Sequence, residues 1–180
     1  FRGIVVDVLN GKARLSAPRV LRQAGRIVRD YRPDVIQGWM YDGNLAAWWL
    51  ARQSEARLAW NVRHSVANLA VEPFGLRQVI RLGALLSSYP DAILYNSRTA
   101  AAQHQKLGYR SEVSRVLPNG FDTVALQPDA AARVRIREEL GIPENTVLIG
   151  HIARYHPMKD HVGLIQAAAE VCRQVPAACF

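Results

Sequence analysis

The sequence predicts an α/β fold, in which a parallel Rossmann-like sheet is flanked by helices and followed by the start of a second unit of the same kind. Short apolar segments alternate with segments of helical period along most of the chain. Strands joined by helices need crossover connections, which favour a parallel sheet covered on both faces. The 180 residues are 49% apolar, so a sizeable core is expected.

The first unit is expected to open with a strand over residues 3–9. A helix follows, capped by Ser16 and with Pro18 in its first turn, where a missing N–H costs little. Further strands are expected at residues 33–39, 56–62, 91–97 and 112–118, with helices at 44–52, 75–89 and 98–107 between them.

Ligands of open parallel sheets bind beyond the carboxyl ends of the strands. The segments in which site residues are expected are therefore 39–44, 63–65, 96–97 and 119–122.

The first helix is strongly amphipathic. Its apolar face carries Val20, Leu21, Ala24, Ile27, Val28 and Tyr31, and its opposite face carries Arg19, Arg22, Arg26 and Arg29. The net charge of +8 would attract anionic partners. A solvated arginine face is the favoured interpretation, and contact with an acidic membrane surface is the alternative.

Two domains are expected, with a partial N-terminal domain over residues 1–122 and a linker plus the start of a second domain over 123–180. The second part should contain a charged helix at 131–140 ended by Gly141, a strand at 146–152, a helix at 160–173 and the beginning of another strand at 177–180. So few elements cannot bury a core, which predicts a truncated domain with strand edges open to self-association.

The segment ARYHPMK at 153–159 lies between the last expected strand and helix. Arg154 offers a planar fork of donors and Lys159 a point charge, and together they suit a diphosphate near a helix N-terminus. The alternative is a solvated basic turn.

Several other classes of protein are excluded. The longest apolar run, LAAWWLA at 45–51, is too short to cross a membrane, and no signal peptide is recognised. Cys172 and Cys179 form no metal or redox motif, which favours a cytoplasmic setting. Phosphate-binding glycine motifs are lacking, and the five-residue spacing of His151, His156 and His161 argues against zinc.

The segments HIARYHPMKDHVGLIQAAAEV, RVLPNGFD, PDVIQGWMYDGNLAAWWLAR, RHS and DAILYNS together resemble the retaining glycosyltransferases of family four. That family has the GT-B fold of two facing Rossmann-like domains. The resemblance implies that Arg154 and Lys159 bind the diphosphate of a nucleotide-sugar donor and stabilise the leaving group. His64 would hydrogen-bond the transferred sugar.

The resemblance also implies that Asn119 and Gly120 form a tight crossing of the backbone near the ligand. Asn96 and Ser97 are expected to act mainly as a helix cap, with ligand binding as a second role. No metal or other cofactor is expected. The implied partners are a nucleotide-sugar and a saccharide or lipid-linked acceptor, with peripheral contact at the inner membrane face and no nucleic acid.

The sequence departs from the family pattern at Ala153, where the family has glycine. The family's N-terminal glycine-rich loop and its E-x7-E pair find no counterpart, which predicts an internal fragment that is inactive alone. The remaining alternative is a non-catalytic basic α/β interaction domain that binds acidic lipid, protein or nucleic acid. Nucleic acid is the less favoured of these, because Trp48 and Trp49 fit a core better than a stacking surface.

Overall fold

The computed structural model describes residues 17–180, so the expected strand at 3–9 and the cap Ser16 lie outside the described residues. The chain divides into two compact units, Phe1–Gly120 (unit 1) and Phe121–Phe180 (unit 2).

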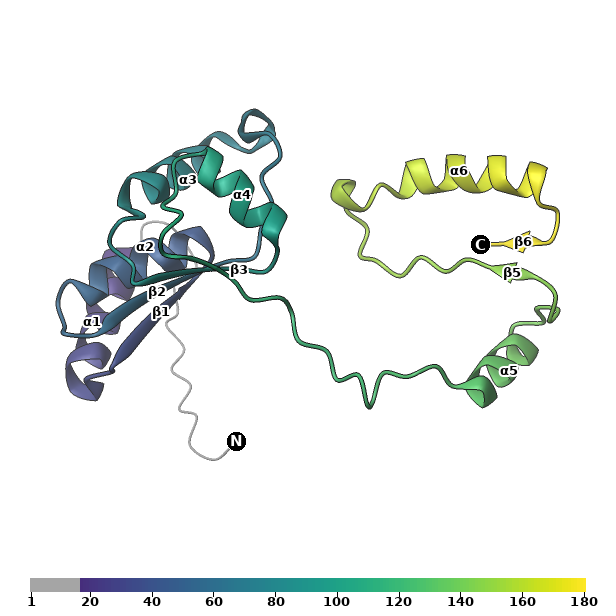
Figure 1. Ribbon diagram of the computed structural model, residues 1–180, viewed down its shortest axis with the longest axis horizontal. Helices are drawn as coiled ribbons and strands as arrows, with labels where there is room; N and C mark the ends of the chain where they lie inside the picture. Colours follow the sequence, from purple (N-terminus) through teal and green to yellow (C-terminus); the bar gives the residue numbers. More distant parts are fainter. Residues whose placement is uncertain (1–16) are drawn as a thin grey trace. The chain divides into compact units, whose positions relative to one another are not determined.

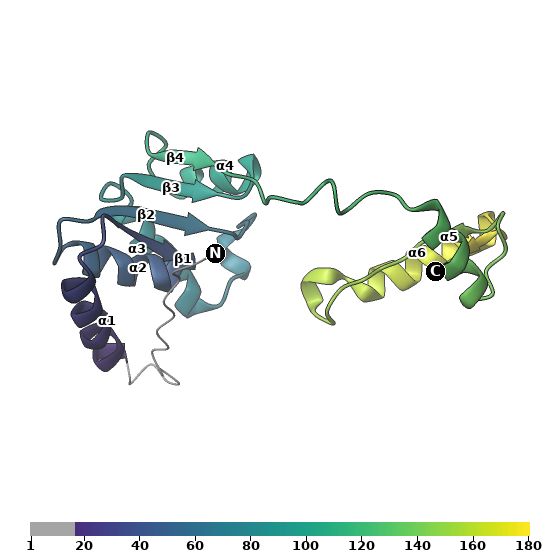
Figure 2. The ribbon, with the colours of Figure 1, turned by 90° about the horizontal axis from the view of Figure 1, so that it is seen from below.

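Unit 1 is built on a four-stranded sheet of order β1-β2-β3-β4, in which every pair of neighbours is parallel (Figures 1 and 2). This confirms the predicted parallel sheet with a helix between successive strands. Its elements are α1 (Ala17–Tyr31), β1 (Val35–Trp39), α2 (Met40–Ala51), β2 (Arg57–Val62), the 3-10 helix η2 (Leu69–Val71), α3 (Phe74–Leu86), β3 (Ala92–Tyr95), α4 (Arg98–Lys106) and β4 (Ser114–Val116).

The core of unit 1 lies on one face of the two central strands. Trp60 and Val62 of β2 and Ile93 and Tyr95 of β3 are buried, and they pack with Ile80 of α3. On the other face of these strands Ala59 and Leu94 are half-buried, and Asn61 is buried. The helices α2, α3 and α4 lie on the same face of the sheet (Figure 1), as expected when parallel strands that follow one another are joined by right-handed crossovers.

The turn from β1 to α2 is tighter than the sequence predicts. The expected helix start at Asn44 is wrong, because α2 begins at Met40, which has a left-handed φ of 61°. Asn44 does not cap the helix. Its side chain Oδ1 accepts a hydrogen bond from the N–H of Asn61 at 3.2 Å, and its Nδ2 donates to the carbonyl of the same residue at 3.4 Å. The Asn44 side chain therefore contacts β2 and does not cap α2.

The arginine face of α1 is solvent-exposed, as the amphipathic pattern predicts, whereas Tyr31 at its end is 76% exposed and does not belong to the buried face. Gly25 is buried and lies near the ring of Trp49 from α2. No helix between residues 17 and 180 has both the length and the hydropathy to cross a membrane.

Unit 2 contains α5 (Ala130–Glu139), β5 (Val147–Leu148), the 3-10 helix η3 (Pro157–Lys159), α6 (His161–Gln174) and β6 (Ala178–Cys179). Strands β5 and β6 form a two-stranded parallel sheet. The strand expected at 146–152 is much shorter, because pairing with β6 ends at Leu148 apart from one hydrogen bond from Ile149. Arg137 is the only buried residue of 121–180, all of which the structure describes.

Candidate functional site

The carboxyl edge of the unit 1 sheet brings three polar aromatic side chains together. Tyr41 comes from the first turn of α2, His64 from the loop after β2, and His104 from α4. The Tyr41 hydroxyl lies 2.8 Å from Nε2 of His104 and 3.2 Å from Nδ1 of His64. These segments follow three consecutive strands, so the parallel order of the sheet aligns them.

His104 is the buried centre of this cluster. Its ring contacts Tyr41, Tyr95 and Tyr109, with centroid separations of 5.8, 5.3 and 5.1 Å. Burial lowers the pKa of His104, an effect that the hydrogen bond with the Ala100 carbonyl partly opposes. Burial likewise raises the pKa of all three tyrosines above their ordinary value. His104 and the three tyrosines are therefore uncharged at neutral pH.

His64 is the member of the cluster that reaches toward solvent, with a side chain that is 20% exposed. Its Nε2 lies 3.6 Å from Oε1 of Glu72, the residue that ends η2. The adjacent Arg63 donates from its guanidinium to the carbonyl of Leu117 at 3.1 Å, which ties the end of β2 to the segment after β4.

Of these residues, the sequence singled out His64 alone. Tyr41 falls in the predicted segment 39–44, but nothing distinguishes it there. The sequence predicts His104 only as part of a helix, although its spacing from Ala100 and Ala101 puts all three on one buried face. Glu72 carries no sequence signal, because its closeness to His64 depends on the path of the loop between β2 and α3.

The other predicted residues of unit 1 have mixed surroundings. Ser97 caps α4 by accepting a hydrogen bond from the Ala100 N–H at 3.1 Å, as predicted. Asn96 is half-buried, and its Oδ1 has no hydrogen-bond partner among residues 17–180. Asn119 and Gly120 are exposed, neither has a positive φ, and a Cβ on Gly120 would meet no atom of the described chain within 4 Å.

In unit 2, Arg154 and Lys159 lie where the sequence places them, between β5 and α6. Both side chains are exposed, and in the described part of the chain neither makes an ion pair or a hydrogen bond. Two exposed cations five positions apart on one loop form a candidate anion site.

The side chains of His161 and Asp160 hold the loop that carries the two cations. The His161 Nε2 donates to the carbonyl of Arg154 at 3.0 Å, and the ring of His161 packs against those of His151 and Tyr155. Asp160, with a left-handed φ of 46°, caps α6 by accepting from the Gly163 N–H at 3.2 Å. A carboxylate therefore already occupies part of this helix N-terminus.

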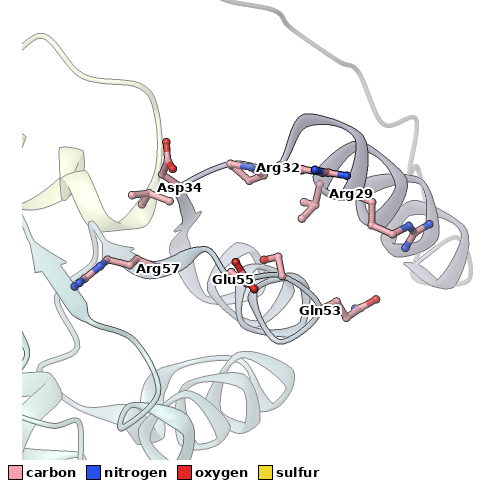
Figure 3. A pocket seen from close by; sticks show the side chains of 10 residues that line it. Arg29, Arg32, Asp34, Gln53, Glu55 and Arg57 are labelled. Carbon is pink, nitrogen blue, oxygen red and sulfur yellow. The ribbon is translucent and has the colours of Figure 1, made fainter.

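A large cavity lies at the opposite end of the unit 1 sheet. It measures about 810 Å³ and opens beside Val35 and Arg57, the first residues of β1 and β2. Figure 3 shows Arg29 and Arg32 from the end of α1, with Gln53 and Glu55 from the turn after α2, around this cavity. It lies away from the carboxyl edge and is not the expected ligand site. No group of three His, Cys, Asp or Glu within residues 17–180 is placed to hold a metal ion.

Comparison with known proteins gives a family match over most of the chain. The sequence model of Glycosyltransferase Family 4 matches residues 1–125. A stretch of 56 residues, 31% of this chain, is 36% identical to EpsF of Bacillus subtilis (strain 168), whose name places it among the glycosyltransferases. Another stretch of 86 residues, 48% of the chain, is 33% identical to the GDP-mannose-dependent alpha-(1-6)-phosphatidylinositol monomannoside mannosyltransferase of Mycolicibacterium smegmatis (strain ATCC 700084 / mc(2)155).

Among solved structures, HepE of Anabaena in complex with UDP and glucose matches with a TM-score of 0.73 and 18% identity, over 90% of this chain. This likeness is one of fold, and it confirms the predicted GT-B-like α/β architecture. The matched regions make up 15% of EpsF, 22% of the mannosyltransferase and 43% of HepE, so the chain spans less than half the length of each.

Proposed function

The chain belongs to Glycosyltransferase Family 4, and from this premise we propose that it is part of a retaining glycosyltransferase. Such an enzyme moves a sugar from a nucleotide-sugar donor to an acceptor hydroxyl. The bond between the anomeric carbon and the diphosphate oxygen breaks, a bond to the acceptor oxygen forms, and the acceptor loses its proton. The anomeric configuration of the donor is kept in the product.

The observation that carries the proposal is the pair of exposed cations Arg154 and Lys159 on the loop between β5 and α6, which make no ion pair within residues 17–180. Negative charge develops on the diphosphate as the sugar leaves, and nearby fixed cations lower the energy of that state. Arg154 can bind two phosphate oxygens with its planar fork, while Lys159 supplies a point charge. In this proposal the two cations stabilise the leaving diphosphate, and no metal ion is needed for that role.

The residues of unit 1 are proposed to contact the sugar. His64 stands at the carboxyl edge of β2, where a ring nitrogen can hydrogen-bond a sugar hydroxyl. The side-chain oxygen of Asn96 has no hydrogen-bond partner within the described residues and is a further candidate for such a bond. Ser97 caps α4. Asn119 and Gly120 are proposed to approach the ligand with their backbone.

The acceptor is proposed to be a saccharide, either free or lipid-linked. A lipid-linked acceptor would bring the protein to a membrane surface, and the exposed arginines of α1 offer a positive face for acidic headgroups. These are Arg19, Arg22, Arg26 and Arg29. The setting proposed for this contact is the cytoplasmic side of the membrane.

The test is calorimetric titration of UDP and of GDP into the wild-type chain and into the double variant Arg154→Ala/Lys159→Ala. Loss of charge-assisted hydrogen bonds to the diphosphate should weaken binding of the preferred nucleotide roughly tenfold or more. The matched control is Arg133→Ala/Arg135→Ala, which removes two exposed positive charges from α5.

The control should change affinity by much less than the loop variant, and the difference should persist at moderate salt. Equal weakening by both variants would mean that net charge alone attracts the nucleotide. Wild-type binding that the loop variant leaves unchanged would refute the role of Arg154 and Lys159. Absence of nucleotide binding, together with binding to anionic vesicles, would favour the basic interaction domain.

A further inference from the structure

The hydrogen bonds around His104 determine which nitrogen of His64 carries its proton. Nδ1 of His104 lies 2.8 Å from the carbonyl oxygen of Ala100, and a carbonyl only accepts, so this nitrogen is the protonated one. Burial lowers the pKa of His104, so its ring is neutral and Nε2 holds a lone pair. The Tyr41 hydroxyl, 2.8 Å from Nε2, must therefore donate to His104.

Because the Tyr41 proton is committed to His104, its oxygen can only accept at its other contact. That contact is Nδ1 of His64 at 3.2 Å, which must carry a hydrogen to donate. Tyr41 is buried, and burial together with the charge of Glu72 raises the pKa of its hydroxyl, so the phenol keeps its proton. The chain of hydrogen bonds thus runs in one direction, from His64 through Tyr41 and His104 to Ala100.

This direction has a consequence at the free end of the His64 ring. In the neutral Nδ1–H form, Nε2 holds a lone pair and faces Oε1 of Glu72 at 3.6 Å. Two acceptors at this separation cannot bond to each other. Both side chains are partly exposed, at 20% for His64 and 18% for Glu72, so a ligand can approach them. A ligand that offers two hydroxyl donors would satisfy both.

We propose that Tyr41 and His104 are positioning residues that hold His64 in its Nδ1–H form, so that Nε2 of His64 and the Glu72 carboxylate together accept hydrogen bonds from hydroxyls of a sugar. The sugar half of this inference rests on the proposed glycosyl transfer, whereas the protonation half rests on the geometry of unit 1 alone. Glu72 becomes a sugar-binding residue that no sequence motif marks.

The first experiment is long-range ¹H–¹⁵N NMR of the histidine rings in the whole chain at about pH 8, above the ordinary histidine pKa. There are five histidines, so a His64→Gln variant assigns the resonance. Wild-type His64 should be protonated on Nδ1. Tyr41→Phe removes the acceptor, and His64 should change to the Nε2–H form, which then donates to Glu72.

The matched control is Tyr95→Phe. Tyr95 is also buried against His104, but its hydroxyl lies outside this chain of hydrogen bonds, so His64 should keep its Nδ1–H form. A wild-type His64 protonated on Nε2 would overturn the inference without any variant. An unchanged ring in a folded Tyr41→Phe protein, or the same change in Tyr95→Phe, would also overturn it.

The second experiment adds UDP-glucose or UDP to the same labelled protein. UDP-glucose should shift the His64 Nε2 resonance and UDP should not, and Glu72→Gln should reduce the shift at least several-fold. An equal response to both nucleotides would refute the sugar-accepting role. If His64 has the expected protonation but calorimetry finds no binding of either nucleotide, the glycosyl-transfer proposal and the sugar-accepting role fail together, and only the positioning role of Tyr41 and His104 stands.

Discussion

Replacement of Gly38, near the end of β1, by alanine is predicted to destabilise unit 1. Gly38 is buried, and a Cβ there would lie 2.5 Å from the Cα of Asn44, 2.6 Å from its Oδ1 and 2.8 Å from the carbonyl oxygen of Gly43. Non-bonded carbon atoms prefer roughly 3.5–4.0 Å. Two of the three contacts are backbone atoms, so α2 itself would have to move.

The expected cost of Gly38→Ala follows from these contacts. Overpacking of a buried site costs roughly 1–3 kcal/mol, and the lower entropy of the unfolded alanine chain offsets about 0.4–1 kcal/mol of it. The net loss should be about 1–2 kcal/mol, which lowers the melting temperature of a domain this size by roughly 4–8 °C per kcal/mol. The same movement would carry Tyr41 away from His104.

Gly43→Ala is the matched control. Gly43 lies within α2, where a Cβ would meet only the Cβ of Trp39, at 4.0 Å. Alanine in a helix interior should raise stability by about 0.5–1 kcal/mol relative to glycine, so the two variants should shift the melting temperature in opposite directions.

Tryptophan fluorescence reports this unfolding selectively, because all four tryptophans of the sequence belong to unit 1: Trp39, Trp48, Trp49 and Trp60. A Gly38→Ala protein that melts at or above the wild-type temperature would refute the packing argument. So would a loss of stability in Gly43→Ala as large as that in Gly38→Ala.

Three further predictions concern single side chains. Folding lowers the pKa of His104, so the unfolded state binds a proton first as the pH falls below 6.5. The free energy of unfolding of unit 1 should therefore fall by up to about 1.4 kcal/mol per pH unit below that value. Urea unfolding followed by fluorescence should show this dependence, and His104→Gln should flatten it. Arg137→Ala removes the donors that lie 2.7 and 3.0 Å from the carbonyl oxygens of Pro143 and Thr146. It should destabilise unit 2 by roughly 2–3 kcal/mol and speed amide hydrogen exchange at 142–147. Replacement of the exposed Arg133 by alanine should change neither quantity. Tyr109→Phe removes the 3.0 Å hydrogen bond from the Tyr109 hydroxyl to the Ile80 carbonyl and should lower the free energy of unfolding of unit 1 by about 1–2 kcal/mol. An unchanged urea midpoint in the same fluorescence assay would contradict this prediction.

Much of the fold could be predicted because the signals for it are local. The alternation of apolar segments with helical segments gave β1 to β4 and the intervening helices in the right order, and Ser97 acts as the cap that its type suggests. The errors arose where a distant contact decides the outcome. The helix expected from Asn44 begins at Met40, while the Asn44 side chain bonds to β2, and the strand expected at 146–152 extends only as far as β6 pairs with it.

The sequence singles out exposed charges as candidates, whereas it gives no sign of the buried polar groups. Arg154 and Lys159 stand out because two cations occur on a short loop, a pattern visible without any structure. His104 is buried within α4, and its importance comes only from the hydroxyl and carbonyl it meets. A sequence shows that a histidine is present but not what its two ring nitrogens face.

The register of the sheet explains how unremarkable segments produce the cluster. Trp39 of β1 pairs with Asn61 of β2, and Asn61 pairs with Leu94 of β3, so the three strands end level with one another. Residues a few positions past each strand end therefore meet at one edge, as Tyr41 and His64 do. A shift of one residue in either pairing would turn the strand's side chains to the other face and separate these groups. The pairing of β1, β2 and β3, rather than any single motif, thus brings together the groups on which the proposed protonation of His64 depends.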